Sequence, residues 1–488
     1  MKFNKTFFIF FLLSLFITEV HSQNTFTYYV KDSTSDDFIL HAIELQNGDF
    51  LLLSCKEKRD SNFNVIIDNI ITTLRKDGSV RQSKVIPTGE PMSTLRSIVY
   101  VNENLFLLSG IVEYDSIWKI ILLTVDSSFN ILKSKIISVG SYYVVYCDIK
   151  ADHAGNYLLY GELSEDSSFY PQMPFIYKVS INLDNLRLQV FNTYGWGFVG
   201  LLEKSNPQGY YFIVDHYNHI GNDQILQLDT SFTVLKIDSV PRQLYNYCNT
   251  RWITEKSFLI TGEKDMSNGR AIGCLMLDTS YLVIHENYLG KPDTISLPAS
   301  HPNLDFYDIR KVYIGGTYNA YPSPVASANS WYFLTQLDTS LEITWQKFYG
   351  GDKYYEMYGI LATKDGGCMM YGTTYDWRKQ DYQRDIFVLK VNKDGLLLNT
   401  DGSISDNIKE FIVFPNPTND RININIQGNN KGSKIEVFDQ FGRSQYKSQL
   451  APNKDQVDID ISTWKPGLYV VRVIIDEKIL GTDKIVKM

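Results

Sequence analysis

The four-letter stretch LDTS occurs at 228–231, 277–280 and 337–340, and its variant VDSS stands at 125–128. Each copy follows an apolar run, such as DQILQ or WYFLTQ, that has the composition of a β-strand. An Asp side chain accepts hydrogen bonds from nearby backbone N–H groups, and Ser and Thr tolerate a chain reversal. We therefore predict a hairpin turn at each copy. The alternative, a calcium loop, needs oxygen ligands at alternate positions, and these letters lack that pattern.

A relaxed match finds seven copies of this turn, spaced 45 to 60 residues apart. The marker aspartates are Asp77, Asp126, Asp184, Asp229, Asp278, Asp338 and Asp394. In five copies an apolar strand ahead of the turn ends in glycine, at Gly110, Gly161, Gly262, Gly316 and Gly372. Cys55 and Asp215 take that place in the other two copies. Repeats of about fifty residues with four short strands each are typical of propeller blades.

The predicted fold is all-β: a seven-bladed β-propeller over residues 23–402, followed by a small C-terminal Ig-like β-sandwich. The seventh repeat lacks a fourth strand, whereas the run FTYYVKD, Phe26 to Asp32, has no blade of its own. We expect this run to become the outer strand of the last blade, because pairing the two chain ends closes the ring. The repeats span approximately 40–89, 95–140, 145–195, 196–240, 249–291, 302–351 and 354–402.

The composition is globular, with 44% hydrophobic and 21% charged residues, and the 33 Tyr and 27 Phe favour strands. The net charge is −8 and Lys and Arg form no run, so nucleic acid is not an expected partner. The five cysteines are odd in number and widely spaced, which predicts buried free thiols and leaves one disulfide open. They are Cys55, Cys147, Cys248, Cys274 and Cys368.

The N-terminus, MKFNKTFFIFFLLSLFITEVHSQ, is predicted to be a secretory signal peptide over residues 1–22. Two lysines precede an apolar run that is too short to span a bilayer. Small and apolar residues at the −3 and −1 positions place the cleavage between Ser22 and Gln23.

The C-terminal segment 411–488 follows a polar linker at 403–410 and consists of alternating runs such as RININIQ and LYVVRVII. Its motifs FPNP, DQFGR, PGLYVVRV and the terminal KIVKM resemble, in order, the type A sorting domain of the Bacteroidetes type IX secretion system. The residues that carry the resemblance are Pro415, Asn416, Pro417, Asp439, Gly442, Arg443, Gly467, Tyr469 and Lys484. An ordinary C-terminal adhesion sandwich is the alternative.

The resemblance implies that the type IX secretion machinery carries the folded protein across the outer membrane to the cell surface or the medium. It further implies that the domain is then removed and that the cargo is attached to surface lipopolysaccharide or released. The repeats look like the degenerate propeller repeats of secreted Bacteroidetes proteins with this tail, a likeness that implies no activity.

Variable loops between the second and third strands of each repeat are the candidate ligand face. Their aromatic residues could stack on sugars or anchor a protein, although they could equally cover neighbouring blades. They are Tyr170, Tyr318, Tyr321, Tyr375, Trp377 and Tyr382.

No catalytic residue, metal ligand or cofactor is predicted. The pair His216 and His219 lacks the glutamate of a zinc protease, and no G-x-S-x-G or phosphate loop occurs. The sequence thus favours a non-catalytic surface protein that binds an unknown glycan or protein. The alternative is a propeller enzyme that acts on polysaccharide or peptide through paired carboxylates.

Overall fold

The computed structural model describes residues 24–31, 35–59, 65–168, 172–192, 200–205, 208–214, 223–240, 244–291, 293–300, 302–320, 328–379, 383–397, 411–414, 418–426, 432–451, 454, 456–475 and 478–487. All regular secondary structure within these ranges is β-strand, which confirms the all-β prediction, and they contain no helix that could cross a membrane. The predicted signal peptide, Ser22, Gln23 and the linker 403–410 lie outside the described residues.

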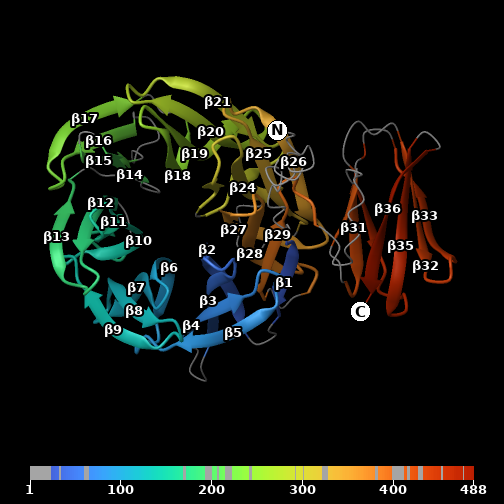
Figure 1. Ribbon diagram of the computed structural model, residues 1–488, viewed down its shortest axis with the longest axis horizontal. Helices are drawn as coiled ribbons and strands as arrows, with labels where there is room; N and C mark the ends of the chain where they lie inside the picture. Colours follow the sequence, from blue (N-terminus) through green and yellow to red (C-terminus); the bar gives the residue numbers. More distant parts are fainter. Residues whose placement is uncertain are drawn as a thin grey trace, which may run out of the picture.

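Antiparallel sheets follow one another along the chain and form a ring around a common axis, which is the architecture of a β-propeller (Figure 1). The first strand of a sheet lies nearest the axis and the last lies at the rim. The part of the ring that the structure describes contains seven such sheets, numbered here in chain order. Sheets 1 to 3 consist of β2 (Asp36–Glu44), β3 (Phe50–Arg59), β4 (Val65–Leu74), β5 (Val80–Ile86); β6 (Ser93–Asn102), β7 (Leu105–Tyr114), β8 (Ile117–Asp126), β9 (Ile131–Ile137); and β10 (Tyr143–Ala151), β11 (Tyr157–Ser164), β12 (Gln172–Val179), β13 (Asn185–Val190).

The remaining sheets of the ring follow the same order, except that the innermost strand of sheet 6 is split in two and sheet 7 takes its outer strand from the N-terminus. Sheets 4 to 7 consist of β14 (Gly200–Ser205), β15 (Gln208–Val214), β16 (Asp223–Leu228), β17 (Val234–Val240); β18 (Tyr245–Thr254), β19 (Ser257–Met266), β20 (Gly269–Asp278), β21 (Val283–Leu289); β22 (Ser296–Pro298), β23 (Leu304–Asp305), β24 (Val312–Tyr318), β25 (Trp331–Leu337), β26 (Ile343–Gly350); and β27 (Tyr354–Ala362), β28 (Cys368–Tyr375), β29 (Asp385–Val391), β1 (Phe26–Val30).

The core of the ring lies between neighbouring sheets. Middle strands such as β11, YLLYGELS, are buried on both faces, whereas rim strands such as β5, VRQSKVI, are mostly exposed. A cluster of buried apolar side chains fills each junction between described sheets, including the junction of sheet 7 with sheet 1. The continuous apolar runs of the sequence therefore mark strands that are covered from both sides.

The N-terminal strand closes the ring as predicted. β1 pairs antiparallel with β29, from Phe26 opposite Lys390 to Val30 opposite Ile386. The buried Lys390 Nζ donates to the carbonyl of Asn24 at 2.6 Å and binds Asp365 Oδ2 at 2.6 Å. The two ends of the propeller segment are therefore held in one sheet.

The marker glycines are explained by contact with the innermost strand of their own sheet. A Cβ on Gly161 would lie 2.0 Å from the carbonyl oxygen of Tyr146, and one on Gly372 would lie 2.0 Å from that of Glu356. The innermost strands shift register beside these glycines, at Val144/Tyr146 and at Met357/Gly359. Such bulges push the backbone toward the second strand, so only glycine fits opposite them.

The predicted hairpin turns are present. In the turn after β8, Asp126 Oδ1 accepts hydrogen bonds from the N–H groups of Ser128 at 2.9 Å and Asn130 at 2.8 Å. The third residue after the aspartate, Phe129, has φ 59° and is buried. This is a three-residue hairpin loop that ends in a left-handed residue.

Three of the seven predicted turn markers, Asp77, Asp184 and Asp394, do not occupy the position that Asp126 has in its turn, because residue type alone does not fix the place of a residue in a hairpin. The N–H and C=O bonding pattern of Asp126 is repeated by Arg75, Ser180 and Asn392, not by Asp77, Asp184 and Asp394. The corrected turn positions are Arg75, Asp126, Ser180, Asp229, Asp278, Asp338 and Asn392. Ser and Asn accept the same backbone hydrogen bonds as Asp, so a search for aspartate misses them.

The C-terminal domain consists of two sheets that share one apolar core. One sheet contains β30 (Phe411–Phe414), β31 (Arg421–Ile426) and β34 (Gln456–Asp460). The other contains β33 (Ser444–Gln449), β32 (Ser433–Asp439), β35 (Gly467–Ile475) and β36 (Lys478–Lys487). Figure 1 shows this domain beside the part of the ring that contains β26 and β29.

Candidate functional site

The connector face is the end of the ring where the loops between second and third strands lie together with the links between sheets. Three residues of the predicted ligand face, Tyr170, Tyr321 and Tyr382, fall outside the described residues. The other three, Tyr318, Tyr375 and Trp377, lie at the connector ends of sheets 6 and 7. The structure thus places the described members of the set in two adjacent sheets.

Tyr318 belongs to an aromatic group in sheet 6. Its ring packs edge-on against Phe348, with centroids 4.7 Å apart, and lies 5.6 Å from Trp331. The Lys291 ammonium lies 5.7 Å from the Tyr318 ring centroid. Tyr318 is half-buried, so part of its ring is already used for packing.

Tyr375 and Trp377 form a second aromatic group with Tyr354. Tyr375 is 3% exposed, so its ring is a packing element and leaves little surface for a ligand. Trp377 is half-buried, and its Nε1–H donates to Asn329 Oδ1 at 2.8 Å. Because Asn329 also donates to the Gly351 carbonyl, Trp377 joins the loops of sheets 6 and 7.

Two charged residues that the sequence pattern does not single out, Asp376 and Arg378, lie on either side of Trp377 in the same loop. Arg378 Nε donates to Asp376 Oδ1 at 2.6 Å, and its Nη2 donates to the backbone carbonyl of Asp352 at 2.9 Å. Partial burial raises the pKa of Asp376, but the Arg378 guanidinium overcomes this and holds that pKa below its ordinary value. The face therefore combines aromatic surface with a fixed ion pair.

Polar side chains near the axis tie each sheet to the next. Asp148 of sheet 3 accepts hydrogen bonds from Ser97 Oγ at 2.6 Å, Tyr160 Oη at 2.9 Å and its neighbour Ile149 N at 2.7 Å. Ser97 belongs to sheet 2, so this carboxylate links two innermost strands.

Asp305 plays the same part in sheet 6. It accepts hydrogen bonds from Arg251 of sheet 5, from the N–H of Phe306 at 2.9 Å and from the N–H of Ala362 of sheet 7 at 2.8 Å. Burial raises the pKa of Asp305, and the Arg251 guanidinium opposes that rise. Its carboxylate is thus shared among three sheets.

Equivalent ties occur at the other junctions of the described ring. Ile98 N–H donates to His41 Nδ1 between sheets 1 and 2, and Lys150 Nζ donates to the Leu201 carbonyl between sheets 3 and 4. Trp252 Nε1–H donates to the Glu203 carbonyl between sheets 4 and 5, and Lys364 N–H donates to Glu44 Oε2 between sheets 7 and 1. These hydrogen bonds hold neighbouring sheets together. The titratable residues near the axis that make them therefore have a structural role.

The described residues contain no group of three His, Cys, Asp or Glu side chains placed to hold a metal. The five cysteines are free and buried, and burial raises the pKa of the Cys55 and Cys274 thiols to about 12. A thiol with such a pKa is not ionised at neutral pH and is a poor nucleophile.

The C-terminal motif residues form a turn and a packed corner. Asp439 Oδ1 accepts hydrogen bonds from the N–H groups of Phe441 and Arg443, and its Oδ2 accepts one from Arg443 Nε at 2.8 Å. Gly442 has φ 77°, which suits glycine at this turn. Tyr469 donates to the Lys465 carbonyl at 2.7 Å and packs on Trp464.

Gly467 and Lys484 lie on the paired strands β35 and β36, whereas Pro415, Asn416 and Pro417 fall outside the described residues. Residues 412–488 match the family model of the Secretion system C-terminal sorting domain. The C-terminal domain is a type IX secretion sorting domain. It directs the chain across the outer membrane to the cell surface or the extracellular space.

No curated protein matches the chain in sequence. Solved structures similar to it include a GH43 β-xylosidase/α-arabinofuranosidase from a compost microbial metagenome, at 12% identity, 53% coverage of this chain, 97% of that chain and a TM-score of 0.31. An α-L-arabinanase of Penicillium chrysogenum has 10% identity, coverages of 77% and 99% and a TM-score of 0.38. A PL25 ulvan lyase has 9% identity, coverages of 75% and 96% and a TM-score of 0.48.

Proposed function

We propose that the exported protein is a non-catalytic binding protein of the cell surface or medium, whose ligand is a glycan or a protein. In this proposal residues 23–402 are one closed seven-bladed propeller, 403–410 are a linker, and 411–488 are an Ig-like sandwich that serves in sorting. Signal cleavage between Ser22 and Gln23 leaves the closing strand β1 close to the mature N-terminus. After export the sorting domain is removed and the propeller is attached to surface lipopolysaccharide or released.

The observation that carries the binding proposal is the gathering of aromatic and charged side chains on the connector face of sheets 6 and 7. Tyr318 is held by packing against Phe348 within sheet 6, and Trp377 and Arg378 are held by hydrogen bonds of the connector loops. All three keep part of their surface exposed. Rigid, partly exposed aromatic rings beside a fixed charge suit stacking on a sugar or anchoring a protein segment. The axial carboxylates Asp148 and Asp305 are engaged in ties between sheets, which favours binding over hydrolysis.

A glycan-array screen of residues 23–405 tests this proposal. We expect binding to at least one glycan class, and we expect Trp377→Ala to weaken it about tenfold or more, as loss of an aromatic anchor does. Trp345→Ala, at the opposite end of sheet 6, is the matched control. Release of reducing ends or peptide fragments that is abolished by Asp148→Asn would instead establish an enzyme.

A further inference from the structure

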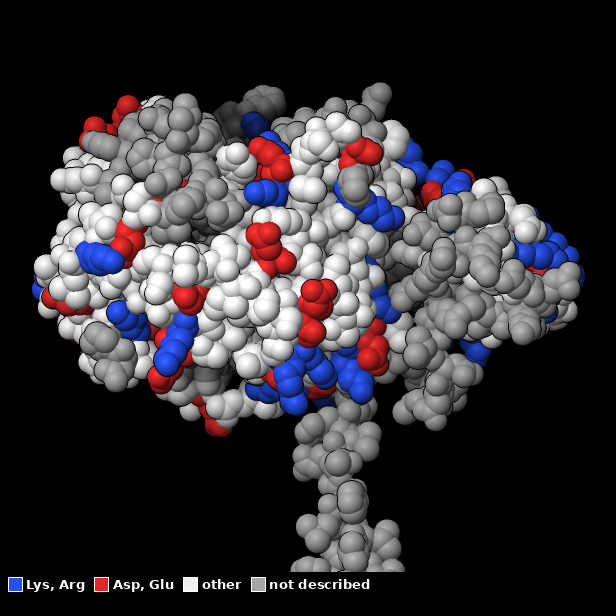
Figure 2. Space-filling model, turned by 90° about the horizontal axis from the view of Figure 1, so that it is seen from above, with Lys and Arg blue, Asp and Glu red and all other residues white. Residues whose placement is uncertain are grey.

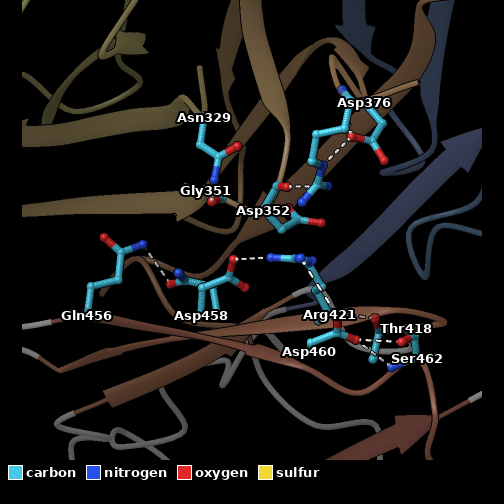
Figure 3. Close-up of polar contacts among 12 residues, drawn as sticks. Asn329, Gly351, Asp352, Asp376, Thr418, Arg421, Gln456, Asp458, Asp460 and Ser462 are labelled. Atoms are coloured by element: carbon cyan, nitrogen blue, oxygen red, sulfur yellow. Dashed lines mark hydrogen bonds and ion pairs between the residues drawn. The ribbon is translucent and has the colours of Figure 1, made fainter. Parts of the chain in front are cut away.

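The sorting domain turns one face toward the connector loops of sheets 6 and 7 (Figure 3). In that view Asp352 and Asp376 of the ring lie opposite Asp458 and Arg421 of the sorting domain. Figure 1 places the domain beside the same part of the ring. The facing surfaces therefore include the loops that we propose as the ligand face.

The strands of the sorting domain explain which side chains face the ring. On β31 and β34, Ile422 and Ile459 point into the domain core, so Arg421 and Asp458 project from the other side of the sheet. Asn423 is on that outer side as well, yet it is only 5% exposed. Asn423 is therefore covered on this outer side, whereas Asp458 and Asp460 on the neighbouring strand remain exposed to water.

The outer side of this sheet carries excess negative charge. Arg421 Nη1 binds Asp458 Oδ2 at 3.0 Å, and its Nη2 lies 3.7 Å from Asp460 Oδ2. One guanidinium thus serves two carboxylates, and the group keeps a net charge of −1. A cation on the opposing surface would balance it.

The opposing surface of the ring supplies Arg378. Its hydrogen bonds to Asp376 and to the Asp352 carbonyl fix the guanidinium at the end of the loop. A guanidinium has five N–H donors, and these two contacts leave others available. On the side of the molecule seen in Figure 2, basic and acidic side chains are interspersed, and neither sign of charge dominates. Attraction between the two parts would therefore depend on individual ion pairs.

The two surfaces are close enough to interact electrostatically. Burial raises the pKa of Asp458, and Arg421 opposes that rise most strongly. Of the two ring residues that act on this carboxyl, Asp352 raises its pKa and Arg378 lowers it. Hydrogen bonds from the side chain and backbone N–H of Ser462 are the main cause of the lowered pKa of Asp460, and Arg378 lowers this pKa further. Conversely, Asp458 contributes to the raised pKa of Arg378.

We propose that in the full-length chain the sorting domain docks on the connector face of sheets 6 and 7, with Arg378 as the cation for the Asp458–Asp460 pair. Docking covers the connector loops around Asp352 and Asp376, so removal of the sorting domain opens access to the ligand face beside them. This last step rests on the proposed binding function, whereas the docking itself does not.

A weak contact is sufficient for such docking. Ion pairs at a surface contribute little each and weaken in salt. However, residues 398–410 tether the two parts, and a short tether gives a local concentration in the millimolar range. A tethered contact can therefore be well populated and still open once the tether is cut.

Hydrogen–deuterium exchange of residues 23–488 tests the docking without any ligand. Arg378→Glu, or Asp458→Arg with Asp460→Arg, should speed uptake about fivefold or more in peptides covering 375–379 and 456–462. Combining the three changes should restore slow uptake, because the charges are then exchanged across the contact. Arg310→Glu, an exposed arginine held by Asp308 outside the facing loops, is the control.

Uptake in β8 and β20 reports whether each variant remains folded. Asp458→Asn with Asp460→Asn provides a second, milder variant that keeps the size of both side chains. The docking is overturned if uptake at 375–379 is the same in the wild type and all folded variants, or if the combined variant exchanges as fast as the single reversals. A failed ligand screen would not produce either result.

Discussion

The ring of Phe26 lies directly over the backbone of Gly78, so closely that a Cβ on Gly78 would fall 2.5 Å from Phe26 Cγ. Gly78 occupies the left-handed turn position of sheet 1, where Phe129 and Phe232 stand in sheets 2 and 4. The closing strand thus supplies, from 52 residues away in the sequence, the aromatic ring that those sheets carry in the turn itself.

Gly78→Ala is expected to destabilise the protein by about 1–3 kcal/mol more than Gly48→Ala. Both glycines have φ near 80°, so both variants carry the same backbone strain. Nothing lies within 4 Å of a Cβ on Gly48, whereas one on Gly78 would collide with Phe26. Urea unfolding of residues 23–488 measures the difference, and equal losses would show that Phe26 does not fill this space in solution.

Lys390→Met should cost about 3–5 kcal/mol, since it leaves the partly buried Asp365 without its cation and Asn24 without its donor. We expect faster proteolysis of the N-terminal strand together with a lower unfolding midpoint. Lys393→Met, an exposed lysine three residues away, should change neither. Unchanged proteolysis of the strand in Lys390→Met would contradict the closing role.

Asn392→Ala should destabilise the turn of sheet 7 by about 1 kcal/mol, because Asn392 Oδ1 accepts hydrogen bonds from the N–H groups of Asp394 and Leu396. Asp394→Ala should stay within about 0.5 kcal/mol of the wild type, as an exposed substitution usually does. Thermal unfolding distinguishes the two. The reverse order would restore Asp394 as the turn residue and refute the corrected alignment.

The sorting domain should lose stability in acid through Glu436. Hydrogen bonds from Arg472 and then Lys434 hold the pKa of Glu436 at about 2. Because this folded pKa lies below the unfolded value, the stabilisation is present above about pH 4.5 and is lost as the pH falls toward 2. Deuterium uptake in β35 should reveal Glu436→Gln as less protected than wild type at pH 7, with the difference disappearing near pH 2. A constant difference across that range would contradict the assignment.

Much of the ring follows from local sequence. Alternation and apolar runs locate the strands, and the turn letters locate the third hairpin of most sheets, because both signals depend on residues close together in the chain. The glycine pattern was visible too, but its cause was not. Only the structure shows that Gly161 faces the carbonyl of Tyr146, since a bulge in the paired strand has no signature of its own.

The candidate face was predicted less well. Residue type singles out both Trp377 and Tyr375, yet burial assigns Tyr375 to packing and leaves Trp377 partly exposed. The sequence does not single out Arg378 and its partner Asp376, because charged residues are common in loops and only their contacts distinguish these two. The hydrogen bond between Ser97 and Asp148 near the axis joins residues 51 positions apart. No spacing or motif in a single sequence indicates such a contact.

By itself, then, the sequence determined the strand content, the repeated turns, the N-terminal closing strand and the sorting tail. Each of these features is recognisable from residues that are close together in the chain. Tertiary structure alone decided which turn residues are equivalent, why the glycines cannot be replaced, where the axial carboxylates are tied and what faces the sorting domain. The reason is physical: hairpins are governed by neighbouring residues, whereas ties between sheets depend on side chains that meet only after the ring has closed.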